Sequence, residues 1–231
     1  MSRTRRYVPF ILGIASALGI AWLVRQRRKK IGSLRVWQQV LTRRHGAEKA
    51  QQLAAAVRQQ SAALVAETPM PENRALSWHL KENILPGLVL YRVLLEEHHG
   101  DQTAALAEVD DALRARTLAK NRTRFALLKL TPAPFSVFRL VFAQTMKQFP
   151  AEGWETTYVE NSADRVAFNM TRCFYLNTLT SYGAPELTAS FCKSDEVMAE
   201  LFPSSIRFVR PHTLGRGDAQ CDFQYCRVEQ P

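Results

Sequence analysis

The chain has 231 residues, 46% of them hydrophobic, and a formal net charge of +10 at pH 7. Eight of its 31 Lys/Arg residues fall within residues 1–30, which hold no acidic residue, so the remainder carries 23 basic against 21 acidic side chains. A nearly neutral remainder without a basic stripe excludes nucleic acid as an expected partner, and the length suits one apolar segment plus one globular domain of about 200 residues.

Residues 7–24 are uncharged and mostly Val, Ile, Leu, Ala and Gly. This length is at the short end of what crosses a bilayer. The apolar run continues directly into the basic residues 25–30 without a small-residue cleavage site, and it has no polar face. The sequence therefore predicts an uncleaved transmembrane anchor within residues 1–30, which makes the chain a single-pass membrane protein.

The charges around this segment predict its orientation. Five basic residues follow residues 7–24 and three precede them, so the positive-inside rule favours a cytoplasmic C-terminal domain. Four cysteines without CxxC pairs fit a reducing compartment, where thiols stay free. The opposite orientation, with two disulfides outside, is the alternative.

Residues 31–130 are expected to be a helical region. Apolar residues recur at spacings of three and four over 33–66, with Gly46 as a break. Residues 68–72 contain two prolines and indicate a linker. Two further helices are expected at 73–99, broken near Pro86, and at 103–130.

Residues 131–231 are expected to combine a small sheet with helices. A short helix is predicted at 135–149. Alternating β-branched and aromatic residues then predict strands, and the expected order is strand 154–160, strand 165–170, helix 172–181, helix 185–201, strand 205–209 and strand 219–228. This β-β-α-α-β-β order, after a helical N-terminal half, predicts an α+β fold.

All four cysteines lie in the last 60 residues. Cys173 falls at the start of a predicted helix, with Asn177 on the same face. The helix dipole would stabilise a thiolate there, and Arg172 would add to the effect. The simpler and favoured interpretation is a cysteine packed in the core.

Cys192 shares one helix face with Asp195 and Glu196, away from the apolar stripe. A thiol and carboxylates on one face are a nucleophile with its base, a set of metal ligands, or an exposed thiol beside solvated charges. The spacing alone leaves these alternatives open.

The glycine-rich turn 215–217 precedes a strand on which Cys221 would face inward with the aromatic residues. Two interpretations of this turn stay open. Its backbone N–H groups would bind an anion, or it is an ordinary hairpin turn. His212 just before it is either a base or a strand-end residue. His98 and His99 are expected to be solvated residues at a helix end.

These C-terminal motifs together resemble the L-2-amino-thiazoline-4-carboxylic acid hydrolase family. The resemblance covers about residues 120–228. Its motifs are Asn169-Met-Thr-Arg172-Cys173, Gly183-Ala-Pro185-Glu186-Leu187, Cys192-Lys-Ser-Asp195 and His212-Thr-Leu-Gly-Arg-Gly217-Asp218-Ala-Gln-Cys221-Asp222-Phe223. The last strand is also similar to that of small-molecule-binding domains of the 4-vinyl-reductase and haem-NO-binding type.

The resemblance implies hydrolytic opening of a cyclic amidine, in which water adds to the ring C=N carbon and an N-carbamoyl cysteine results. Such a reaction needs a nucleophile or activated water, an acid, and a cation for the substrate carboxylate. Cys192 would be the nucleophile or position the water, and Asp195 or Asp218 would carry the proton. Arg172 or Arg210 would hold the carboxylate.

The remaining implied site residues are Cys173 and Cys221 on the catalytic side and Asn177, Glu186 and His212 around the substrate. No cofactor is expected, although a metal held by Cys173, Cys192, Cys221 and a carboxylate stays open. The expected partners are a small-molecule substrate and the membrane. The alternative function is a membrane-tethered domain that binds a ligand without turnover.

Overall fold

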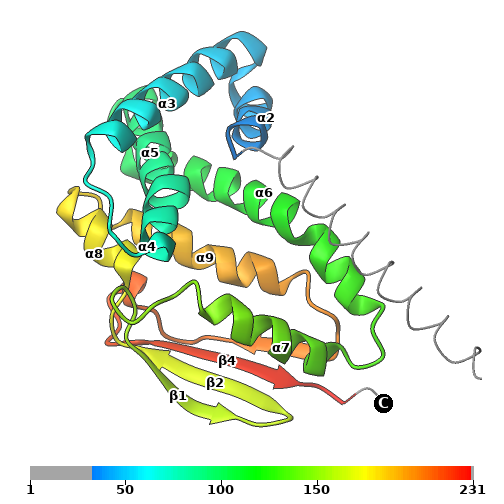
Figure 1. The fold of residues 1–231 in the computed structure, drawn as a ribbon. Helices are drawn as coiled ribbons and strands as arrows, with labels where there is room; N and C mark the ends of the chain where they lie inside the picture. Colours follow the sequence, from blue (N-terminus) through cyan, green and yellow to red (C-terminus); the bar gives the residue numbers. More distant parts are fainter. Residues whose placement is uncertain (1–32, 230–231) are drawn as a thin grey trace, which may run out of the picture.

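The computed structural model describes residues 33–229, which begin with a pair of helices (Figure 1). These are α2 (Ser33–His45) and α3 (Ala47–Glu67). Gly46 between them has φ of +80°, a left-handed conformation that glycine adopts without steric cost. The predicted break at this residue is therefore confirmed.

A π-helical turn interrupts the next helical stretch. This helical stretch comprises α4 (Arg74–His79), the π-turn η1 (Leu80–Ile84) and α5 (Leu85–Glu97). The break precedes Pro86, which lies in the first turn of α5. Proline has no N–H to donate to the preceding turn, and the Glu82 carbonyl in that turn accepts from Arg116 instead. The long helix α6 (Gln102–Lys129) and the short α7 (Pro134–Met146) follow.

The C-terminal part contains a four-stranded antiparallel sheet in the order β1-β2-β4-β3. In chain order it runs β1 (Thr156–Asn161), β2 (Arg165–Met170), α8 (Phe174–Ser181), α9 (Leu187–Ala199), β3 (Ile206–Val209), the 3₁₀ turn η2 (Leu214–Arg216) and β4 (Cys221–Arg227). On β4, Cys221, Phe223 and Tyr225 are buried and alternate with less buried residues.

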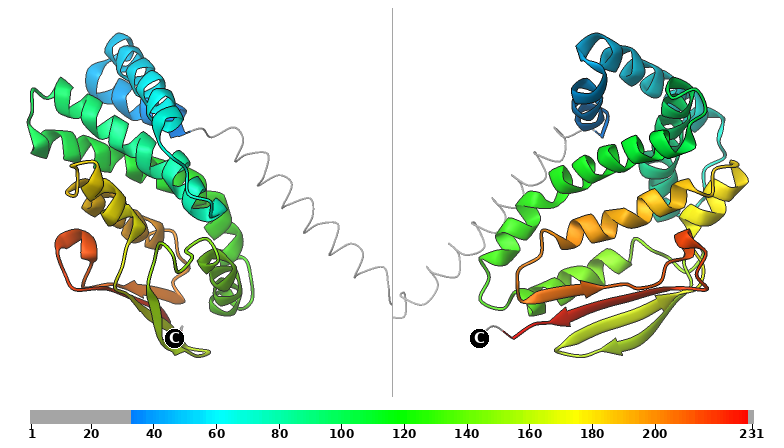
Figure 2. Two further views of the ribbon diagram at one scale, coloured as in Figure 1. Left: turned by 60° about the vertical axis from the view of Figure 1, so that its left-hand side comes forward. Right: turned by 180° about the vertical axis from the view of Figure 1, so that it is seen from behind.

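The elements form layers. Helices α7 and α9 lie over one face of the sheet, and α6 runs beside α9 (Figures 1 and 2). On its other side α6 packs against α2 and α5. One hydrophobic core lies among the helices and a second, rich in aromatic rings, lies between the sheet and α6–α7.

The structure agrees with the predicted α+β class but corrects the transmembrane part of the prediction. Across residues 33–229, no helix combines the length and the apolar character needed to span a bilayer. The longest, α6, carries charged residues along most of its length. The predicted span 7–24 lies outside the described residues. The predicted single-pass membrane location, with a cytoplasmic domain, is therefore not supported.

Candidate active site

A cavity of about 590 Å³ lies between α6, α7, α9 and the inner face of the sheet. Most of its wall is apolar or aromatic, and a few polar groups converge on it, as is usual for small-molecule sites. The predicted site residues that line it are Cys173, Cys192, Asp195, Arg210 and Cys221. Residues up to 48 positions apart in the sequence thus line one cavity.

Arg210 connects these groups. Its guanidinium donates to the Asp195 carboxylate at 2.7 Å, to the Cys192 carbonyl at 2.9 Å and to Glu196 at 3.1 Å. The side chain is 1% exposed and lies over the ring of Phe223. Burial opposes the charge, but the neighbouring Asp195, Cys192 and Glu196 raise the pKa of Arg210, so it stays a cation. Arg210 therefore orients α9 rather than being free for a substrate.

The three pocket thiols are protonated at neutral pH. Burial raises the pKa of Cys192 to about 11, with Asp195 adding to the effect, and burial also raises that of Cys221 to about 11. Cys173 caps α8, yet burial outweighs the backbone N–H groups near its sulfur and raises its pKa too. The structure therefore favours a packed Cys173 over a dipole-stabilised thiolate.

Asp195 combines cavity access with an unusual environment. About 35% of its side chain is accessible, and only Oδ2 takes part in a hydrogen bond within residues 33–229. Burial raises the pKa of the Asp195 carboxyl, opposed by Arg210. A carboxyl group with a raised pKa suits proton transfer. Its Oδ1 atom is available to water or a substrate.

The cavity lining also includes Arg116, which the sequence analysis missed. This α6 residue is 5% exposed, and its Nη2 donates to the Glu82 carbonyl at 3.1 Å and to the side-chain oxygen of Asn83. Both acceptors belong to the π-turn η1. Within the described chain no carboxylate comes within 4.0 Å of this guanidinium, and burial lowers its pKa. In the described part of the chain, Arg116 is thus a buried cation without a carboxylate at ion-pair distance, and it lines the cavity.

One sequence signal did point to Arg116. It follows Ala112 and Leu113 at helical spacing on a buried face of α6. A charged residue on an apolar stripe is rare unless it is paired or functional. Recognising the site also required knowing that α6 faces α9, which the local pattern does not contain.

The other predicted site residues lie outside the cavity wall. Asn177 is exposed on α8, and the exposed Arg172 donates to the Ala151 carbonyl. Glu186 accepts from the Tyr91 hydroxyl at 2.6 Å. Exposed His212 pairs with Asp222, and Asp218 accepts from the Thr213 backbone N–H within the turn. These five residues are not brought together with the thiols.

The turn around η2 presses closely on α9. A Cβ at Gly215 would lie 2.8 Å from the Cys192 sulfur and 3.3 Å from the Ala189 nitrogen. The Leu214 N–H also points to the Cys221 sulfur at 3.2 Å. Glycine at 215 thus allows the turn to bring β4 and α9 together at the cavity.

The described cysteines are free thiols. Within residues 33–229, the one group of three or more candidate ligand atoms lying within 4.8 Å of one another is His45, His98 and Glu108. That group contains no cysteine, and the alternative of a metal held by Cys173, Cys192, Cys221 and a carboxylate stays a prediction.

The family comparison matches the stretch that builds this cavity. The model of the L-2-amino-thiazoline-4-carboxylic acid hydrolase family matches residues 78–225, which include Arg116, α9 and most of β4. No curated protein matches the chain.

Two solved structures show distant similarity. One is an Fe(II) unliganded H-NOX protein from K. algicida, with TM-score 0.37, 11% identity, and coverage of 86% of this chain and 96% of that one. The other is a mutant of the same H-NOX protein, with TM-score 0.35, 10% identity, and coverage of 87% and 98%. Similarity at this level supports no statement about ligand or fold. The family match spans more than half of the sequence, and on that basis the chain belongs to the L-2-amino-thiazoline-4-carboxylic acid hydrolase family.

Proposed function

We propose that this chain hydrolyses a small cyclic amidine that carries a carboxylate, of the 2-amino-thiazoline-4-carboxylate type. The observation that carries the proposal is the cavity itself: the buried cation Arg116, with no carboxylate partner in the described chain, shares it with the Cys192–Asp195–Arg210 cluster. Arg116 and Asp195 both line this cavity, and the proposal places one small molecule in contact with both.

Arg116 would bind the substrate carboxylate, because a guanidinium offers paired donors that fit a carboxylate. The cavity is otherwise largely apolar, which suits the ring. Binding an anion there also neutralises a charge that the protein itself leaves without a carboxylate partner. Arg116 replaces the two residues predicted to bind the substrate carboxylate. Arg172 lies outside the cavity, and Arg210 already donates to Asp195 and Glu196.

Asp195 would act on water. Its ionised form accepts one proton as the water oxygen bonds to the ring carbon between nitrogen and sulfur, giving a tetrahedral intermediate. In the addition the C=N π electrons pass to the ring nitrogen. Collapse of the intermediate then forms the C=O bond and breaks the carbon–sulfur bond. The hydroxyl proton passes to the ring nitrogen, and the proton on Asp195 passes to the leaving sulfur. The N-carbamoyl cysteine product balances this addition of one water.

Cys192 would position this water rather than attack. A thiol with a pKa of about 11 is almost fully protonated at neutral pH, and the thiolate is the nucleophilic form. The protonated thiol is a weak hydrogen-bond donor. Cys192 and Asp195 are three residues apart on α9, so they lie on neighbouring positions of one helix face.

The activity is tested by incubating the full chain with 2-amino-thiazoline-4-carboxylate and following N-carbamoyl cysteine by mass spectrometry. Asp195→Asn should lower kcat at least about 100-fold, the usual contribution of a general base. Asp218→Asn is the matched control, because Asp218 lies in the turn outside the cavity wall, and it should retain turnover. Ligand binding without any turnover by the folded wild type would instead favour a binding domain.

Arg116→Gln should raise KM more than it lowers kcat, since the carboxylate is held in both ground and transition state. We expect a loss of roughly tenfold to 100-fold in kcat/KM, the scale of a charged hydrogen bond of about 1.5–3 kcal/mol. Arg172→Gln is the matched control and should leave KM unchanged. An unchanged KM in folded Arg116→Gln would show that the carboxylate is bound elsewhere.

A further inference from the structure

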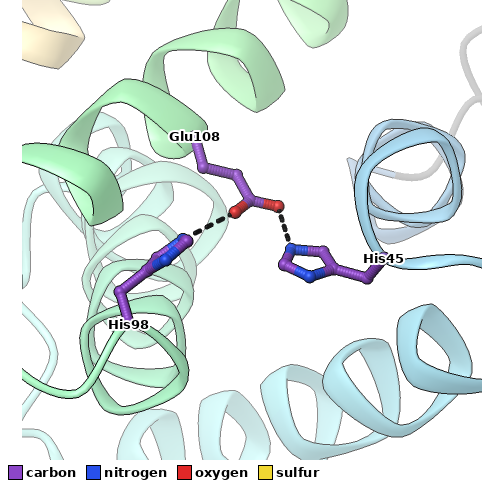
Figure 3. Close-up of side chains that lie close together, drawn as sticks. All are labelled: His45, His98 and Glu108. Atoms are coloured by element: carbon purple, nitrogen blue, oxygen red, sulfur yellow. Dashed lines mark hydrogen bonds and ion pairs between the residues drawn. The ribbon is translucent and has the colours of Figure 1, made fainter.

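Three helices meet around Glu108, away from the cavity. The carboxylate on α6 lies between two imidazoles, His45 from the end of α2 and His98 just after α5 (Figure 3). His45 Nε2 is 2.7 Å from one carboxylate oxygen and His98 Nε2 is 2.9 Å from the other. The expectation that His98 is a solvated capping residue is therefore wrong.

The burial of Glu108 makes this cluster unusual. Its side chain is 0% exposed, on the same buried part of α6 as Ala105, Val109 and Ala112. A carboxylate is rarely buried unless it is paired or bound to a metal. In residues 33–229 its ion-pair partners are the two histidines alone, while nearby Arg44 and Lys49 pair with Asp111 and Glu97.

We propose that His45, His98 and Glu108 bind a divalent transition-metal ion, with Zn²⁺ the best fit to the donor set. Two imidazole nitrogens and a carboxylate leave a fourth tetrahedral position for water. The ligand atoms all lie within 4.8 Å of one another. Tetrahedral bonds of about 2.0–2.1 Å place ligand atoms roughly 3.3 Å apart, so small side-chain rotations would admit the ion in place of the shared protons.

The ion has a route to the cluster. The side chains of His45 and His98 are 16% and 24% exposed, whereas Glu108 is completely covered. The site would join α2, α5 and α6 at one point. Glu108 precedes Arg116 by eight residues, about 12 Å along the helix, so the ion would stabilise the helical layer without entering the cavity.

The test uses the full chain without a histidine tag, stripped with a chelator and then titrated with Co²⁺ and Zn²⁺. We expect about one ion per chain, and a visible spectrum of tetrahedral Co²⁺ without the intense sulfur-to-cobalt charge-transfer band that cysteine ligands give. Zn²⁺ should also raise the melting temperature, because an ion that binds only the folded chain stabilises it.

His98→Asn should weaken binding at least tenfold and remove the zinc-dependent rise in melting temperature. His99→Asn is the matched control, since His99 is the exposed neighbour with φ of +53°, which asparagine tolerates. Unchanged binding in His98→Asn, or a sulfur charge-transfer band, would overturn the proposal. So would the absence of bound ion in a folded wild type, which would leave the cluster as a hydrogen-bonded helix junction.

Discussion

At the scale of single residues, burial governs the chemistry of the cavity more than charge does. Cys173, Cys192 and Cys221 each have a raised pKa, because the loss of hydration is larger than the attraction of Arg210 or of backbone N–H groups. At a cysteine that begins a helix, the helix dipole favours the thiolate and would lower the pKa instead. The sign of the pKa shift depends on how deeply the thiol is buried, which the local sequence does not encode.

The pH dependence of thiol alkylation measures the pKa of Cys192 directly. The rate of iodoacetamide reaction at Cys192 should be low at pH 7.5 and rise toward pH 11, since only the thiolate reacts and the pKa is about 11. Peptide mapping by mass spectrometry separates it from Cys226, which lies outside the cavity wall. Rapid modification of Cys192 at pH 7, saturating below pH 9, would restore it as a nucleophile.

At the scale of elements, the contact between the η2 turn and α9 sets the geometry of the site. Gly215→Ala should destabilise the fold by about 1–3 kcal/mol, the usual cost of an added methyl in a packed contact, because the new Cβ would lie 2.8 Å from the Cys192 sulfur. Urea unfolding of Gly215→Ala, Cys192→Ala and the double variant measures the coupling. The double variant should be more stable than the sum of the single effects by at least about 0.5 kcal/mol.

Gly217→Ala serves as the control for this cycle. It meets no atom within 4 Å but has φ of +90°, so its cost is backbone strain of about 1 kcal/mol or more. That cost should not change when Cys192 is replaced by alanine. Equal coupling at positions 215 and 217 would indicate that the turn is mobile rather than pressed against the helix.

The elements themselves were largely readable from the sequence, whereas their mutual contacts were not. Strand alternation identified the inward face of β4, with Cys221 and Phe223, and Gly46 marked a helix boundary. Arg116 was missed because its partners come from a π-turn more than 30 residues earlier. The Glu108 cluster was missed for the same reason, since His45 is 63 residues away.

At the scale of the whole molecule, α8 joins the two hydrophobic cores. Phe174 and Tyr175 pack against both the helical core and the aromatic core above the sheet. The Tyr175 hydroxyl is 2.9 Å from His79 Nδ1, and His79 Nε2 is 2.9 Å from the Gln148 carbonyl. His79 therefore connects α4, α8 and the segment after α7. In its neutral form His79 donates from Nε2 to the Gln148 carbonyl, and its Nδ1 accepts a hydrogen bond from the Tyr175 hydroxyl.

This connection predicts a loss of stability in mild acid. Burial lowers the pKa of His79 to about 4, against the opposing hydrogen bond to Gln148. The unfolded chain takes up a proton near pH 6.5 while the folded chain does not, so the stabilisation is present above pH 6.5 and falls as the pH drops toward 4. Between pH 7.5 and pH 5 the loss should be about 2 kcal/mol.

Urea unfolding of the wild type and of His79→Gln, followed by circular dichroism at both pH values, isolates this contribution. Glutamine does not titrate but keeps one donor and one acceptor, so the variant should lose about 2 kcal/mol less than the wild type on acidification. Carboxyl groups such as Asp195, whose pKa is raised, act equally in both proteins and cancel in the difference. Identical pH dependence in the two proteins would mean that His79 is solvated or already protonated in the fold, and that the two cores are joined by packing alone.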